Sequence, residues 1–277
     1  MRTEQLTQGD ADIAPIAALI GDPARARVLT ALTDGRALPA SRLAAEAGVA
    51  PSTVSEHLAR LLAAGLVTMR PEGRSRFYRL ASPAVAEALE AISRISPPQP
   101  IRSLRQGTYA RALREARTCY NHLAGRLGTG LLDGLLDQGL LSGGDGRHHP
   151  EQAVADRLSA PGRDLSYRLT PCGETALDEI GVDLDAVLAR HPAVRYCLDW
   201  SEQQHHLAGP LGTALADRLF ALGWVRRTDR RRVVRVTDSG RENLPEVLGL
   251  PPGWDQPAPA GEARDQPISA ARTTATG

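Results

Sequence analysis

Hydrophobic residues recur at helical spacing through the segment 51–64, and a polar face runs along its other side. The apolar positions that fall together at about 100° per residue are Val54, Leu58, Leu61 and Leu62. The polar positions opposite them are Ser52, Thr53, Glu56 and Arg60, with Ser55 and His57 on the flanks. The pattern predicts a helix with one face in a core. The polar face is either simply solvated or has a partner.

The elements around this helix favour a partner. Residues 41–47 read as a short helix, and Gly48 can supply the positive φ of a tight turn. After the helix, TMRPEGRSRFYRL (68–80) reads as a basic hairpin that turns at 71–73. Helix, turn, helix and hairpin in this order predict a winged helix-turn-helix.

A winged helix-turn-helix reads double-stranded DNA with its second helix and contacts phosphates with its wing. The residues predicted to contact DNA are Ser52, Thr53, Ser55, Glu56, His57, Arg60, Arg70, Arg74 and Arg76.

The second half of the chain contains an internal repeat. Residues 121–141 and 205–225 align without a gap and are identical at about half of their positions. Each copy is followed by a similar second piece, at 167–177 and 234–244. We expect two degenerate winged units that lack the short helix preceding the long one. The predicted fold class is therefore mainly α with small β-hairpins (α+β).

Proline and composition suggest the domain limits. The stretch SPPQP at 96–100 cannot continue a helix, so we expect a DNA-binding and dimerisation domain over 1–96. A repeated effector domain would occupy 101–250, with one repeat at about 104–180 and the other at 190–250. Residues 251–277 are rich in Pro, Gly and Ala, and we expect a disordered tail there.

Charge and composition narrow the function classes. The chain of 277 residues has 33 basic and 32 acidic side chains, so any attraction to nucleic acid must come from a local surface. No basic leader and no run of 18 apolar residues is present, which predicts a cytoplasmic protein without a membrane partner. The few scattered cysteines are expected to be thiols.

Those thiols suggest a metal site in the repeats. Cys119, His122, Cys197 and His206 form a donor set that zinc and softer ions prefer. Further candidates are Cys172, Asp199 and His205. The alternative is that the cysteines are buried structural thiols that bind no metal, and two points leave it open. Cys119 and His122 share a face only if they are helical, and the ungapped alignment places Gln203, not a cysteine, opposite Cys119.

Glycines in the repeats offer a second candidate site. Gly125, Gly128, Gly209 and Gly212 would lie on one face of each predicted repeat helix. An interior glycine costs about 0.5–1 kcal/mol relative to alanine, so something must approach closely there. Either the related helices pack together, or the glycines line a cleft for an effector.

Three segments together resemble a known family. They are DPARARVLTALTDG (22–35), LAAEAGVAPSTVSEHLARLLAAGLV (43–67) and RPEGRSRFYRL (70–80), and they look like ArsR/SmtB-type regulators over about residues 10–95. The resemblance implies a homodimeric repressor that leaves its operator when it senses an effector, with helices near 11–20 and 83–94 at the dimer contact. The family's usual metal ligands are missing, because no cysteine precedes Cys119 and the closing helix has no histidine. Sensing should therefore lie in the repeats.

We predict a one-component transcriptional repressor that is not an enzyme and whose effector is a small molecule, a metal or an oxidant. Two alternatives remain. An enzyme could use the winged helix for dimerisation, although GTGLLDG (128–134) lies in a helical pattern and not in a cofactor-binding turn. A protein-interaction module could use the same helices without DNA.

Overall fold

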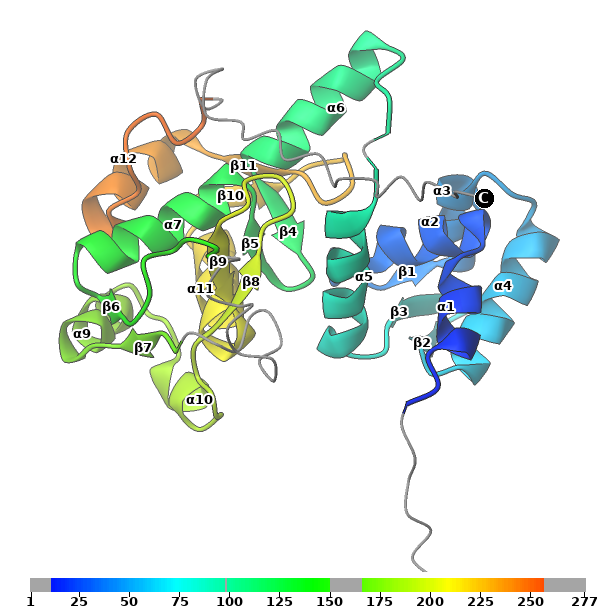
Figure 1. Cartoon of the computed structure of the whole chain (residues 1–277), viewed down its shortest axis with the longest axis horizontal. Helices are drawn as coiled ribbons and strands as arrows, with labels where there is room; N and C mark the ends of the chain where they lie inside the picture. Colours follow the sequence, from blue (N-terminus) through cyan, green and yellow to red (C-terminus); the bar gives the residue numbers. More distant parts are fainter. Residues whose placement is uncertain (1–10, 98, 150–165, 257–277) are drawn as a thin grey trace, which may run out of the picture.

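The computed structural model describes residues 11–97, 99–149 and 166–256. Two hydrophobic cores divide these residues: one is built from Val28 through Leu89 and the other from Ala116 through Leu250. Figure 1 shows them as two neighbouring bodies, with α5 (Pro83–Ile95) on the side of the first that faces the second. We call them the N-terminal unit and the C-terminal unit.

The N-terminal unit is a winged helix-turn-helix, as the sequence predicts. Its remaining helices are α1 (Ala14–Ile20), α2 (Pro23–Leu32), α3 (Ala40–Ala47) and α4 (Pro51–Ala63). Its strands are β1 (Leu38–Pro39), β2 (Val67–Glu72) and β3 (Ser75–Leu80), which form an antiparallel sheet in the order β1-β3-β2.

Local chemistry fixes the turn between α3 and α4. Gly48 ends α3 with a φ of 67°, which glycine adopts at little cost, and Pro51 opens α4. Val54, Leu58 and Leu61 are buried, as the pattern predicts. The polar face of α4 is thereby turned away from the core.

The C-terminal unit contains the same series of elements twice, each time as hairpin, helix, hairpin and helix. After α6 (Leu104–Glu115), the first series is β4 (Arg117–Cys119), β5 (His122–Ala124), α7 (Arg126–Asp137), β6 (Leu141–Ser142), β7 (Arg168–Leu169) and α9 (Pro171–Glu179). After α10 (Leu184–Leu188), the second is β8 (Arg195–Leu198), β9 (His205–Ala208), α11 (Gly209–Ala221), β10 (Val225–Arg227), β11 (Val234–Val236) and α12 (Asp238–Leu248).

Each repeat begins with a β-hairpin at a place where the sequence pattern predicts a helix. Residues 122–124 and 205–208 are strands, because they pair with 117–119 and 195–198. Gly125 precedes α7 with a φ of 74°, and Gly209 opens α11 with a φ of 68°. Neither is an interior glycine of a helix, so the expected glycine faces do not form as predicted.

Protein atoms fill the space beside the four repeat glycines. A Cβ on Gly128 would lie 2.5 Å from the carbonyl oxygen of Leu123 and 3.4 Å from the Cβ of His206. A Cβ on Gly212 would lie 2.7 Å from the carbonyl oxygen of Leu207 and 3.4 Å from the Cβ of His122. At Gly125 and Gly209 it would meet Arg114 and Arg195. Close packing therefore accounts for all four glycines, with Gly128 and Gly212 facing the other repeat, and their contact with an effector stays a prediction.

The end of the described chain packs against the C-terminal unit. Leu250 is buried, Trp254 contacts the same core, and Asp255 pairs with Arg241 at 2.9 Å. The first six residues of the segment expected to be a disordered tail are thus folded, and 257–277 lie outside the described residues. Among the described helices, none is both long and apolar enough to cross a bilayer.

We expect Gly134→Ala to destabilise the C-terminal unit. A Cβ there would lie 2.4 Å from the carbonyl oxygens of Leu248 and Gly249, so α7 and α12 would have to separate. Overpacking of this kind costs about 1–3 kcal/mol of unfolding free energy, measurable by urea denaturation. The control is Gly107→Ala in α6, where the nearest atom is 3.5 Å away and stability should rise by up to about 1 kcal/mol. Equal effects of the two changes would contradict this packing.

Candidate functional site

The polar face of α4 is available for contact. Ser52, Ser55, Glu56 and Arg60 are exposed, and Thr53 and His57 are half-buried. Ser55 donates its hydroxyl to the carbonyl of Pro51 at 2.9 Å, which leaves its lone pairs free to accept. These six side chains lie along one helix, as the sequence predicts.

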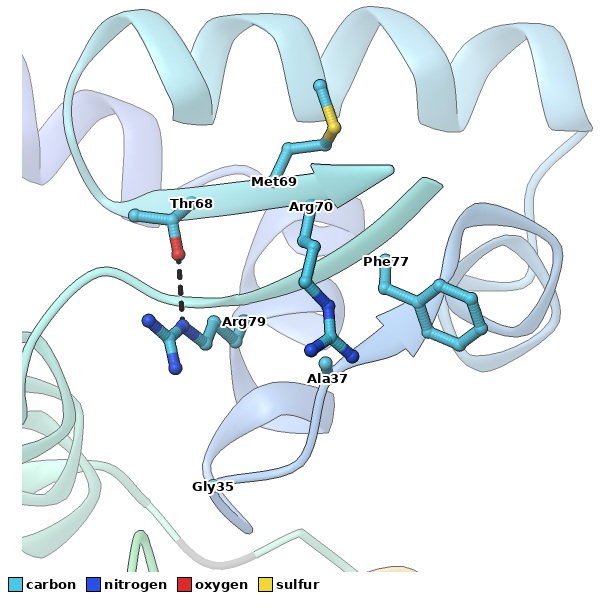
Figure 2. Close-up of a pocket in the computed structure, with 7 residues that line it drawn as sticks. All are labelled: Gly35, Ala37, Thr68, Met69, Arg70, Phe77 and Arg79. Atoms are coloured by element: carbon cyan, nitrogen blue, oxygen red, sulfur yellow. Dashed lines mark hydrogen bonds between the residues drawn. The ribbon is translucent and has the colours of Figure 1, made fainter. Parts of the chain in front are cut away.

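The wing arginines divide between two faces of the sheet. Met69 points toward α4, whereas Arg70 extends toward Ala37 on the other face (Figure 2). Arg79 lies on that other face too, beside Thr68, and both arginines line an open hollow there. Side chains alternate along a strand, so Arg76 shares the face of Tyr78 and Met69. Arg70 also pairs with Glu72 at 2.9 Å. Of the predicted phosphate contacts, Arg76 thus lies on the face of α4, Arg74 is exposed in the turn, and Arg70 faces away.

Four potential metal ligands meet in the C-terminal unit. The ligand atoms of Cys119, His122, Cys197 and His206 all lie within 4.8 Å of one another. Three of these residues are buried and Cys197 is half-buried. The sequence named these four, and the fold brings all of them together.

The register of the two hairpins explains why the four potential ligands lie together. Cys119 pairs directly with His122 across β4 and β5, and Cys197 pairs with His206 across β8 and β9. The two cysteines therefore are equivalent in the fold, contrary to the ungapped alignment. That alignment failed because the first turn has only residues 120 and 121, while the second spans 199–204. A gap in the turn would have aligned Arg-x-Cys at 117–119 with 195–197.

Each of the two histidines has a buried ring nitrogen that makes no hydrogen bond. The Nε2 atoms of His122 and His206 are buried and have no hydrogen-bond partner. On the other side of each ring, Nδ1 of His122 lies 3.3 Å from Oδ1 of Asn121, and Nδ1 of His206 lies 3.4 Å from Oδ2 of Asp199. The second contact has ion-pair distance but not hydrogen-bond alignment. A neighbour on Nδ1 and a bare Nε2 is the arrangement that metal-binding histidines have.

Burial sets the protonation of these groups. It lowers the pKa of His206 well below its usual value, so the imidazole is neutral and keeps its lone pair. The contact with Cys197, followed by burial, raises the pKa of the Cys119 thiol well above its usual value. Without a cation, Cys119 is therefore a neutral thiol.

Asp199 joins the two hairpins from the second turn. It is fully buried, and so is Arg117, whose guanidinium donates to Oδ1 of Asp199 at 2.8 Å. Oδ2 accepts from the backbone nitrogen of Gly125 at 2.7 Å, where α7 begins. Burial raises the pKa of Asp199, but Arg117 and the other donors outweigh it, and the pKa is below its usual range. Asp199 is a charged support of the cluster and not one of the four potential ligands.

The remaining cysteine and histidine candidates lie elsewhere. Cys172 is exposed on α9. His205 contacts the hydroxyl of Tyr167 through Nδ1 at 2.9 Å and stacks beside Tyr196. Neither belongs to the cluster.

An apolar surface remains on the N-terminal unit. Helix α1 buries none of its residues, and Ile13 and Ile16 have exposed fractions of 75% and 37%. On α5, Ile92 and Ile95 have exposed fractions of 39% and 76%. Exposed large apolar side chains are candidates for a contact with a protein partner.

Comparisons with known proteins agree with the geometry of the N-terminal unit. A family model described as a helix-turn-helix domain matches residues 20–70. Over 231 residues the chain is 37% identical to the uncharacterized HTH-type transcriptional regulator YdfF of Bacillus subtilis (strain 168), with 83% of this chain and 94% of that protein covered. This similarity extends through most of both chains and therefore includes much of the C-terminal unit.

A second similarity is shorter. Over 77 residues the chain is 43% identical to the HTH-type transcriptional regulator CmtR of Mycobacterium tuberculosis (strain ATCC 25618 / H37Rv), covering 28% of this chain and 64% of that protein. The NMR structure of the cadmium metal-sensor CMTR from Mycobacterium tuberculosis is 38% identical, covers 33% of this chain and 99% of that chain, and has a TM-score of 0.26. The span from Cys119 to His206 exceeds 77 residues, so the matched sequence cannot contain the whole cluster.

We expect Asp199→Ala to destabilise the protein strongly. The change leaves the charge of Arg117 buried without its partner, which costs about 3–5 kcal/mol of unfolding free energy. Chemical denaturation with fluorescence detection would measure it. As a control, Asp255→Ala breaks a partly exposed pair with Arg241, which is worth at most about 1 kcal/mol. A small loss at Asp199, similar to the control, would show that the buried pair does not hold the hairpins together.

Proposed function

The chain belongs to the HTH-type transcriptional regulators of the ArsR/SmtB type, and from this we propose that this DNA-binding regulator is a homodimeric repressor with a metal ion as effector. The observation that carries the proposal is the cluster of two cysteines and two histidines whose ligand atoms lie within 4.8 Å. Helix α4 and the wing would bind the operator, and the C-terminal unit would bind the effector.

The exposed isoleucines support a dimer. Ile13 at the start of α1, Ile16 within it, and Ile92 and Ile95 on α5 would be covered by the same helices of a second copy, as a two-fold interface requires. Two copies would present two α4 helices to two half-sites of DNA. In each copy, Thr53 and Arg60 would contact bases, and Arg74 and Arg76 would contact phosphates.

The chemistry of the cluster supports a metal effector. Two thiol groups and two imidazoles form a donor set for zinc, which also suits softer divalent ions. The buried Nε2 atoms of the two histidines have no partner, and a bound ion would satisfy both of them. When bound, the ion would supply the positive charge that stabilises deprotonated sulfur on Cys119 and Cys197.

Other functions have less support. The glycine-rich stretch 128–134 lies within α7, where it packs against β5, β9 and the end of α12 and forms no cofactor-binding turn, so we propose no catalytic role for the C-terminal unit. A module that binds only proteins would not need exposed arginines on its wing. An oxidant is the second candidate effector, because the sulfurs of Cys119 and Cys197 are close enough to react with each other after small movements.

Replacing both Arg74 and Arg76 with Ala should weaken binding to specific and random duplexes alike. Removal of one phosphate interaction flattens the dependence of log K on log salt by roughly 0.9, so the double change should flatten it by about 4 across two half-sites. Binding titrations at several salt concentrations, with duplex from upstream of the chain's own gene, measure this slope. Arg241→Ala removes an exposed arginine from α12 and should leave the slope unchanged. A slope unaffected by the double change would remove the wing from the interface.

Cys197→Ser should abolish high-affinity uptake of Zn²⁺ or Cd²⁺ and leave binding of DNA by the metal-free protein intact. We expect the affinity for metal to fall by more than about 100-fold. Loss of a residue that only supports a ligand already costs about 10- to 100-fold, and loss of a ligand should cost more. Competition with a chromophoric chelator measures the affinity, and cadmium–thiolate absorption reports the sulfur ligands.

The matched control is Cys172→Ser, which changes an exposed thiol outside the cluster and should bind metal like the unchanged protein. Equal uptake by both variants would place the metal elsewhere. Absence of uptake by the unchanged protein, together with a Cys119–Cys197 disulfide after treatment with peroxide, would favour the oxidant instead.

A further inference from the structure

We propose that the metal cluster controls the DNA-binding unit through two contacts of the C-terminal unit, one made by Tyr120 and the other by the ion pair of Arg232 with Glu90. This inference rests on the metal effector proposed above and adds the route by which that effector acts. Both contacts begin at the hairpin that carries two of the ligands.

The first contact is the turn of the β4–β5 hairpin. Tyr120 follows Cys119 directly, and its backbone nitrogen donates to the carbonyl of Thr33 at 2.6 Å, at the end of α2. Its side chain packs against the core of the N-terminal unit. The carbonyl oxygen of Tyr120 lies so close to Gly35 that a Cβ there would be 2.6 Å away. The turn between two ligands is therefore docked on the loop that leads from α2 to β1.

The second contact is made by Arg232, in the turn between β10 and β11. Its Nε donates to the carbonyl of Thr118 at 2.9 Å, and its own carbonyl accepts from the nitrogen of Thr118 at 2.9 Å. Its guanidinium forms an ion pair with Glu90 of α5, and both side chains are nearly buried. Arg232 thus connects the strand beside Cys119 with the helix predicted to form the dimer contact.

A third, weaker contact lies next to the second. Arg231 pairs with Glu46 of α3 at 3.3 Å, and both side chains are about one-fifth exposed. The arginine-rich segment 226–235 therefore contacts α3 through Arg231 and α5 through Arg232.

Backbone conformation supports a role beyond packing. Among the described residues other than glycine, positive φ angles occur at Tyr120 (58°), Gln203 (55°) and Arg232 (62°). Side chains other than glycine rarely adopt this conformation, and it persists where the surroundings enforce it. Tyr120 and Arg232 are the two contact residues, and Gln203 lies in the other turn of the cluster. Two of the three positive φ angles therefore belong to the residues that connect the ligands with the DNA-binding unit.

The two units can be coupled because the ligands come from both repeats. A metal ion bound by Cys119, His122, Cys197 and His206 would hold the β4–β5 turn against the β8–β9 hairpin. Without the ion, the two hairpins are held together by the hydrogen bonds of Asp199 with Arg117 and Gly125, by the bond of Arg117 to Ser201, and by packing. Any shift of that turn is passed to Thr33 and to Glu90, and hence to the sheet of the wing and to α5. An effector can alter DNA binding only through such a difference between two states.

The test compares the DNA affinity of the full chain with and without Zn²⁺ in variants of the contacts. The ratio of the two affinities in the unchanged protein should be roughly 5- to 150-fold. Glu90→Gln removes the charge of the ion pair, and Tyr120→Gly removes the docked side chain at a φ that glycine tolerates. Both variants should bind Zn²⁺ as before, with the affinity ratio reduced toward 1. Arg230→Ala changes an exposed arginine of the same segment and should keep the full ratio.

Hydrogen exchange of the unchanged protein gives a measurement that needs no variant. Addition of Zn²⁺ should alter the exchange of amides in the turn 120–121, in the loop 33–36 and in α5. A full ratio in both Glu90→Gln and Tyr120→Gly, or exchange changes confined to the C-terminal unit, would overturn the route while leaving the metal effector intact. Failure of the unchanged protein to bind Zn²⁺ would instead remove the effector and the route together.

Discussion

The buried ion pair between Arg117 and Asp199 is the constraint on which the C-terminal unit depends. Two charges without access to water are tolerated only when nearly all of their hydrogen-bonding groups are satisfied. Asp199 meets this condition with donors from Arg117, from Gly125 and from its own turn, including Ser201. Because these donors belong to different repeats, the pair fixes the two hairpins relative to each other and so brings the four potential ligands together.

The cluster is the product of one hairpin used twice. Each copy contributes a cysteine and the histidine paired with it, and two copies packed face to face supply a complete donor set. The turns of the two hairpins differ, and each difference has a consequence. The short turn places Tyr120 on the N-terminal unit, whereas the long turn supplies Asp199 as support for His206.

The net charge of the chain does not show where its charged side chains act. Basic and acidic residues nearly cancel, yet Arg74 and Arg76 are exposed on the wing. Arg231 and Arg232, in contrast, are neutralised by Glu46 and Glu90 within the protein. A net charge near zero therefore conceals a local basic surface as well as an internal set of ion pairs between the two units.

The sequence by itself determined the winged helix-turn-helix and the identity of the four clustered cysteines and histidines. Helical spacing of Val54, Leu58 and Leu61, the glycine turn and the basic hairpin are local signals, which depend on neighbours along the chain. Tertiary structure decided what depends on distant residues: that 122–124 pair as a strand, that protein atoms fill the space beside the glycines, and that Asp199 and Arg232 connect the site. Strand pairing, close packing and buried ion pairs join positions far apart in the chain, and local periodicity carries no information about them.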